Sequence, residues 1–199
     1  MFRKMKSKSI LLFVAFTLMS TMVFAKGHRN EVMSYFFLKK ADFTLEQAIQ
    51  QLEEENKGKV VSARVKLNDT LQLFELKRIE NDVVMEVLFD PKTKKVVETS
   101  KDGIFSRYND SEDRTAAVKS KITLLNAMEI VKGKYEGVIV KGAFSHKNLQ
   151  AYYRIHTVTN QGGYMILVDA ESGETFKDVR NEKRGHRRKN GDYDKDRHY

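Results

Sequence analysis

The sequence predicts an α+β protein made of two repeats, each a helix followed by a three-stranded antiparallel sheet. A shift of 79 residues aligns one half with the other, without a gap, over more than 50 residues. Within each half, apolar residues first recur at helical spacing and then alternate with polar ones, as in strands. The chain has 199 residues, of which 41% are hydrophobic, and no Cys. That length suits one ordinary domain or two small ones, stabilised by an apolar core rather than by disulfides.

Residues 1–25 have the pattern of a cleaved signal peptide. Four Lys or Arg residues lie among the first eight, residues 10–19 are apolar, and Val23 and Ala25 occupy the −3 and −1 positions of a small-residue cleavage site. The apolar stretch is about half of the ~20 residues that span a bilayer. We therefore expect a mature chain that starts near Lys26, has no stable membrane anchor, and is periplasmic or secreted by a bacterium. Residues 26–43 form its N-terminal segment.

The net charge of +9 comes mostly from the ends of the chain. Residues 1–25 contribute +4 and residues 181–199 contribute +3, which leaves +2 for residues 26–180. A nearly balanced folded region, in an exported chain, argues against a nucleic-acid partner.

The first repeat covers residues 44–98. Its helix is predicted from apolar residues spaced i, i+3, i+4 and i+7, and Thr44 with Gln47 forms a capping box at its start. The helical apolar residues are Leu45, Ala48, Ile49 and Leu52. The predicted strands are Val60–Leu67, Leu71–Ile79 and Val83–Phe89.

The second repeat covers residues 122–179 and follows a linker at 99–121. Thr123 is the N-cap candidate of its helix, whose apolar residues are Leu124, Ala127, Met128 and Val131. The predicted strands are Val138–Phe144, Leu149–Val158 and Gly163–Val168. Residues 180–199 are rich in charge and lack apolar residues other than two Tyr, so we expect a disordered tail.

Asp90 and Asp169 are equivalent carboxylates at the ends of the third strands. Asp169, after an apolar run, could be a catalytic group. However, a turn follows each Asp, with Gly173 suited to a positive φ in the second copy, and an Asp side chain accepts hydrogen bonds from backbone N–H groups two residues on. The same turn in both copies favours a structural role for Asp90, Asp169 and Gly173.

These features together resemble the PepSY domain family. The second copy carries the fuller match, in TLLNAMEI and ILVDAESGETF, while the first departs at Pro91 and at Lys94, where the family has Gly. The resemblance implies a small α+β module outside the cytoplasm, in a family found in peptidase propeptides and exported bacterial proteins. It suggests inhibition or modulation of peptidases and supplies no catalytic residues.

Sequence motifs for catalysis, metals and cofactors are absent. The five His are scattered without HxxxH or HExxH spacing, and there is no GxSxG, P-loop or GxGxxG motif. Alternating Asp residues in the tail resemble the start of a calcium loop but lack its Gly and its bidentate Glu. We therefore predict no catalytic residues, no metal site and no cofactor.

Tyr152, Arg154 and His156 are the candidate binding residues. If Tyr153 and Ile155 face the helix, these three side chains line the opposite face of their strand, where they could form a recognition surface. An ordinary outward strand face is the alternative. The third strands carry apolar residues on both faces, which suggests that the repeats pack sheet against sheet or that the protein forms a homodimer.

The leading hypothesis is an exported, non-enzymatic protein that binds or modulates a protein or peptide partner outside the cytoplasm, with a peptidase as one candidate. A periplasmic sensory or small-ligand-binding accessory is the second hypothesis, and a hydrolase with an unrecognised site is the third. A deep apolar cleft would favour the second. A flat exposed face or a free sheet edge would favour the first.

Overall fold

The structure is a computed structural model of the whole chain, and it describes residues 26–55, 57–67, 72–103, 108, 110–160 and 162–178. The predicted signal peptide, at 1–25, and the predicted tail, at 180–199, lie outside these residues. The described helices are α2 (Lys26–Lys40), α3 (Leu45–Glu54), α4 (Ser111–Lys119) and α5 (Leu124–Lys134). The strands are β1 (Lys59–Leu67), β2 (Gln72–Glu80), β3 (Val83–Asp90), β4 (Lys95–Lys101), β5 (Val138–Lys147), β6 (Gln150–Thr159), β7 (Gly162–Asp169) and β8 (Thr175–Asp178).

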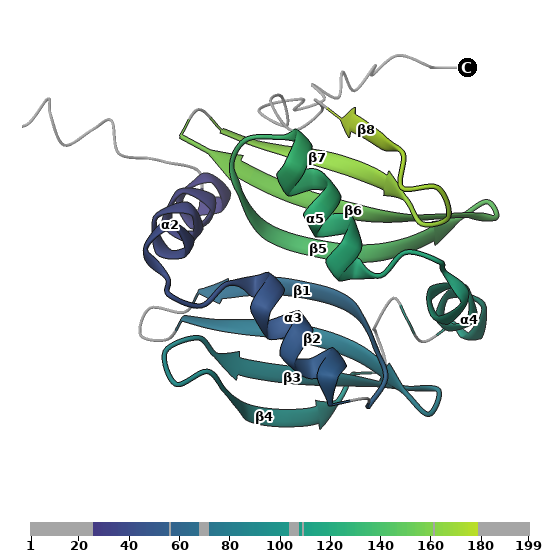
Figure 1. Cartoon of the computed structure of the whole chain (residues 1–199). Helices are drawn as coiled ribbons and strands as arrows, with labels where there is room; N and C mark the ends of the chain where they lie inside the picture. The colour runs from purple at the N-terminus through teal and green to yellow at the C-terminus, as the bar shows by residue number, and fades with distance from the viewer. Residues whose placement is uncertain are drawn as a thin grey trace, which may run out of the picture.

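All eight strands form one antiparallel sheet in the order β4-β3-β2-β1-β5-β6-β7-β8. Helices α3 and α5 cover one face of it, while α2 and α4 lie at opposite ends of its central strands (Figure 1). The α+β class and the antiparallel sheet are confirmed. Each half contains a fourth strand, however, because the short return segments after Asp90 and Asp169 pair with β3 and β7.

The two halves join edge to edge, so the expectation that they pack sheet against sheet is wrong. β1 pairs antiparallel with β5 through three residue pairs centred on Ala63 and Gly142. The pairing is available because the order within each half leaves its first strand at an edge, where backbone groups are unpaired until the other half supplies them.

The same local signals start both main helices. Thr44 and Gln47 form the predicted capping box, with Gln47 N donating to Thr44 Oγ1 at 3.3 Å. Thr123 forms a second box with Asn126, whose amide oxygen replaces the usual Glu or Gln. Gly58 and Gly137 follow the helices at positive φ, and a Cβ at Gly58 would meet Ile79 O at 2.0 Å.

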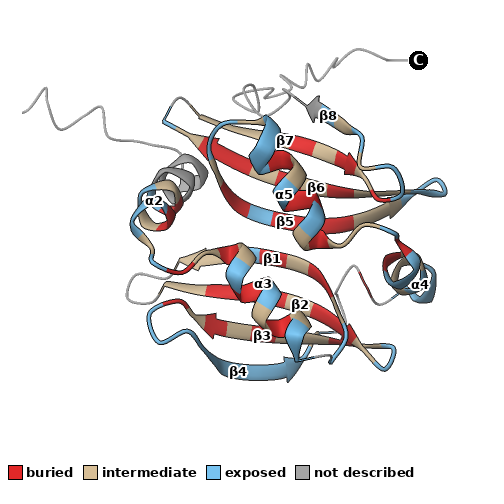
Figure 2. Ribbon diagram, in the orientation of Figure 1, coloured by how far each residue is buried: buried red, intermediate tan, exposed pale blue. Residues whose placement is uncertain are grey.

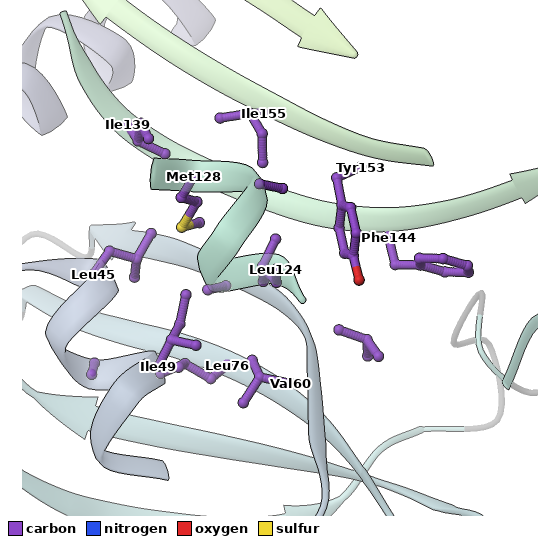
Figure 3. Packing of buried hydrophobic residues seen from close by; sticks show 14 of the residues in the cluster. Leu45, Ile49, Val60, Leu76, Leu124, Met128, Ile139, Phe144, Tyr153 and Ile155 are labelled. Carbon is purple, nitrogen blue, oxygen red and sulfur yellow. The ribbon is translucent and has the colours of Figure 1, made fainter. Parts of the chain in front are cut away.

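The core lies between the sheet and the two central helices (Figures 2 and 3). The apolar residues predicted for each helix are all buried in it. α3 and α5 contact each other, and Lys132 reaches Glu46 at 3.7 Å across their solvent side. Two helices therefore form one layer on one sheet, with a single continuous core.

The segments outside the predicted repeats also contain helices. α2 lies in residues 26–43 and α4 in the predicted linker, and they end at Lys40 and Lys119, again 79 residues apart. The order helix, helix and four strands is therefore the same in both halves. Both helices are more polar on average than α3 and α5, and the apolar spacing that predicted α3 and α5 did not reveal them.

Candidate functional site

The predicted binding residues lie on the helix-free face of the sheet. On β6, Tyr153 and Ile155 are buried on the helix side, while Tyr152, Arg154 and His156 point the other way and are half-buried. The strand alternation thus places the three side chains together on one face, as we expected. Their binding role stays a prediction.

The strand neighbours of these residues make the face amphiphilic. On β7, Asp169 pairs with Tyr152, Leu167 with Arg154, and Met165 with His156. Because directly paired residues point to the same face, thioether, aliphatic, aromatic and cationic side chains alternate there. Such a mixture is typical of recognition surfaces.

The helix-free face of the first half is different, because its charges neutralise one another. Arg64 binds the nearly buried Glu75 at 2.7 Å, and Lys66 contacts the same carboxylate at 3.2 Å. Burial opposes ionisation of Glu75, but the hydrogen bonds from Arg64 and Lys66 hold its pKa below the ordinary value. On the same face, Lys77 Nζ forms an ion pair with Asp102 Oδ1 at 2.7 Å. The charges on this half of the face are thus paired with one another.

The Asp turns have similar geometry in the two halves. Asp169 Oδ1 accepts hydrogen bonds from the backbone N–H groups of Glu171 and Ser172 at 2.9 and 2.8 Å. Asp90 Oδ1 accepts from Lys92 N at 2.9 Å. Gly173 has the positive φ of +75° that this turn requires. Each carboxylate thus accepts hydrogen bonds from its own turn. These bonds explain why an Asp is present at both positions, without a catalytic role.

A buried polar cluster joins the two halves, and sequence reasoning missed it. Lys59 Nζ donates to Ser120 Oγ at 2.8 Å and to Ser120 O at 2.7 Å, and Tyr153 Oη lies 3.1 Å from Ser120 Oγ. Burial raises the pKa of Tyr153 to about 12 and lowers that of Lys59. A Ser beside a Lys of lowered pKa is a nucleophile–base arrangement in some hydrolases.

The surroundings of Ser120 favour a structural role for this cluster. Its side chain is within hydrogen-bond distance of the carbonyl oxygens of Ala117 and Ile122, and the residue is only 7% exposed. Tyr153 Oη also donates to Ile122 O at 2.6 Å. The cluster therefore fixes the α4–α5 connection to both halves of the sheet. Its members are too far apart in the chain for any spacing motif to reveal them.

Tyr108 closes the seam between the halves where the β1–β5 pairing stops. Its hydroxyl lies 3.1 Å from Val61 O and 3.0 Å from Phe144 O, and the residue is 2% exposed. These carbonyl groups would otherwise be buried next to a strand pairing of only three residue pairs. No pattern in the sequence predicts this contact.

A cavity of about 490 Å³ lies in the first half, between the C-terminal end of α2 and the β3–β4 turn. Its lining includes Phe36, Phe37, Lys40, Lys92 and Lys94. Among the described residues, no group of His, Cys, Asp or Glu side chains could hold a metal ion. Within the same part of the chain, no helix is long and apolar enough to cross a membrane.

Comparison with known proteins gives a family match for the second half. Curated protein sequences gave no match to the chain. A solved structure from Clostridium difficile 630, provisionally described as a lipoprotein, is similar with a TM-score of 0.42 and 16% identity, covering 70% of this chain and 95% of that one. The family described as "Peptidase propeptide and YPEB domain" matches residues 121–179, within one residue of the boundaries that the sequence resemblance indicated. Residues 121–179 of this chain therefore match the PepSY family.

Proposed function

We propose that this protein is an exported, non-enzymatic binding protein that engages a peptide or protein partner, and that the partner is a peptidase or its substrate. The observation that carries the proposal is the free edge of the sheet at β4. Every residue of β4 is exposed, including Val96 and Val97 (Figure 2). An extended peptide can add to such an edge by backbone hydrogen bonds.

The family supports a peptidase connection, since PepSY domains are named for peptidase propeptides. A propeptide acts by contact with its enzyme and needs no chemistry of its own. The arrangement here fits that mode, because the Ser120 cluster is covered and the Asp turns use their own carboxylates. Export is supported by the residue pattern of positions 1–25.

The amphiphilic face of β6 and β7 is the second contact surface of the proposal. Tyr152 and Arg154 are residue types enriched among the few that dominate binding energy. This face and the β4 edge lie in different halves of one sheet, so a partner could use either one.

Matched substitutions on the two sheet edges test the proposal. Val97 is the extra residue of a bulge and has no partner in β3, so Val97→Lys should leave the β3–β4 pairing in place. Its equivalent on β8, 79 residues later, is Phe176, which is also exposed. Partners captured by the purified protein from an extracellular extract would be identified by mass spectrometry, and their affinities for both variants measured.

A partner that uses the β4 edge should bind Val97→Lys about fivefold more weakly, the loss of roughly 1 kcal/mol of apolar contact, and should bind Phe176→Lys normally. Because Phe176 pairs with Leu167 on the amphiphilic face, a partner that uses the β6–β7 face should show the reverse. A captured peptidase should change its activity when the protein is added. Equal binding by wild type and Val97→Lys would rule out the β4 edge, and a partner that is chemically converted by the protein would refute the non-enzymatic reading.

A further inference from the structure

We propose that the cavity between α2 and the β3–β4 turn is a binding site for a carboxylate attached to an apolar body. No residue of β4, β6 or β7 lines this cavity, so the inference does not depend on the proposed partner. Its walls combine the aromatic rings of Phe36 and Phe37 with three lysines, Lys40, Lys92 and Lys94.

The cavity is open because the first half lacks the backbone hydrogen bonds that hold the corresponding turn of the second half against its neighbours. In the second half, Ala170 N donates to Ala151 O at 3.0 Å, and Ile122 N donates to Ala170 O at 3.1 Å. The residue equivalent to Ala170 is Pro91, which has no N–H to donate. Among the described residues, no hydrogen bond joins Phe43 N to Pro91 O, the counterpart of the second contact.

An ion pair that helps to close the second half is also missing from the first. Lys121 binds Glu171 at 3.0 Å across the equivalent gap. The corresponding residues, Asp42 and Lys92, have exchanged charges and both line the cavity, yet they form no ion pair in the described structure. The turn and the α2–α3 connection, which lie at the same end of the sheet in Figure 1, are left apart.

The charge of the lining selects an anion. Lys40, Lys92 and Lys94 face a single carboxylate, that of Asp42. The nearby Asp90 is occupied, since its two oxygens accept hydrogen bonds from Lys92 N and from Thr93 Oγ1. Three ammonium groups around a partly enclosed space attract a negative group, and charge-assisted hydrogen bonds to a carboxylate are stronger than neutral ones.

The two aromatic rings of the lining, Phe36 and Phe37, favour an apolar body. Phe37 meets Phe74 edge-on at 6.2 Å, and Phe43, which is outside the lining, stacks on Phe89 with ring centroids 5.3 Å apart. Phe36 remains 56% exposed at the rim, where it is available to cover a ligand. The equivalents of Phe36 and Phe37 in the second half are Thr115 and Ala116, so these two aromatic rings are present in the first half alone.

Lys94 gives independent support, because its backbone is in a conformation that favours Gly. Its φ is +57°, whereas the equivalent residue, Gly173, has φ +75°. A residue other than Gly is strained when its φ is positive, and such strain tends to persist at functional positions. Here the side chain extends over the Phe43 ring at 5.8 Å and lines the cavity. The first half thus has a lysine with a strained backbone at a position where Gly would remove the strain.

The experiment is a titration of the purified protein, by calorimetry and NMR, with two carboxylates and their neutral counterparts. Octanoate is compared with 1-octanol, and acetyl-Leu-Phe with a free C-terminus is compared with its amide. We expect saturable binding of at least one carboxylate, at least about tenfold tighter than its neutral counterpart, as for loss of one charge-assisted contact. Octanoate alone would identify a free acid as the ligand, and the peptide would identify a C-terminal carboxylate.

Variants place the binding in the cavity. Lys94→Gly should weaken carboxylate binding several-fold without lowering the melting temperature, because it removes both a cation and the backbone strain. Lys40→Glu should weaken binding too, while Lys119→Glu, at the matching end of α4, should not. Absence of saturable carboxylate binding, equal binding of the neutral probes, or full affinity in both cavity variants would each overturn the inference. Val97→Lys should bind carboxylates normally, which separates this site from the β4 edge.

Discussion

Replacing Asp169 by Ala tests whether this carboxylate is structural. Its Oδ1 accepts from Glu171 N at 2.9 Å, from Ser172 N at 2.8 Å and from Ser172 Oγ at 3.1 Å. A typical hydrogen bond contributes about 0.5–1.5 kcal/mol net, and loss of a capping side chain costs about 0.5–2 kcal/mol. Because the three bonds share one oxygen and an exposed turn, we expect Asp169→Ala to lower the free energy of unfolding by about 1–2 kcal/mol.

Asp90→Ala provides the matched comparison. Asp90 accepts one backbone bond, from Lys92 N, and one from the Thr93 hydroxyl, so the expected loss is smaller, about 0.5–1 kcal/mol. Urea denaturation gives both values. In a protein of this length a loss of 1 kcal/mol lowers the melting temperature by about 2–4 °C.

The pH dependence supplies a second readout for Asp169. The backbone N–H of Ser172 is the main cause that holds the pKa of Asp169 below its ordinary value, and burial opposes it. A lowered pKa in the folded state stabilises the protein above the unfolded carboxyl's value of about 3.9, and this contribution is lost as the pH falls through the folded value. Between pH 6 and pH 2.5 the wild type should therefore lose more stability than Asp169→Asn. Unchanged stability in Asp169→Ala, together with loss of partner or ligand binding, would refute the structural reading.

Tyr108→Phe should lower the free energy of unfolding by about 1–2 kcal/mol in urea denaturation, because it leaves buried carbonyl groups at the β1–β5 seam without their donor; an unchanged value would mean that water replaces the hydroxyl. The double variant Tyr152→Ala, Arg154→Ala should keep the circular dichroism spectrum of the wild type and bind a captured partner that uses the β6–β7 face at least about tenfold more weakly, as for one lost hot spot; full affinity in a partner that also binds Val97→Lys normally would place the contact elsewhere. N-terminal sequencing of exported protein should begin near Lys26, and recovery of the uncleaved chain would contradict the signal-peptide prediction. Removal of residues 180–199 should leave the melting temperature nearly unchanged in calorimetry, whereas a large decrease would show that they dock on the fold.

The sequence by itself determined the local structure of each half. Helical spacing predicted the buried faces of α3 and α5, alternation predicted which side of β6 faces the core, and Thr44 and Thr123 predicted where the helices begin. These features depend on residues close together in the chain, so short-range periodicity and capping chemistry are sufficient to predict them. The same local signals carried the PepSY resemblance of residues 121–179.

Only the tertiary structure decided how the halves meet and where the cavity lies. Edge-to-edge pairing of β1 with β5, the Tyr108 seam and the Lys59–Ser120–Tyr153 cluster join residues that are 33 or more positions apart, for which no spacing rule exists. Pro91 and Lys94 were visible as departures from the family pattern. Their consequence was not visible, because an open cavity results from contacts that Ala170 and Glu171 make in the other half and that the first half cannot make.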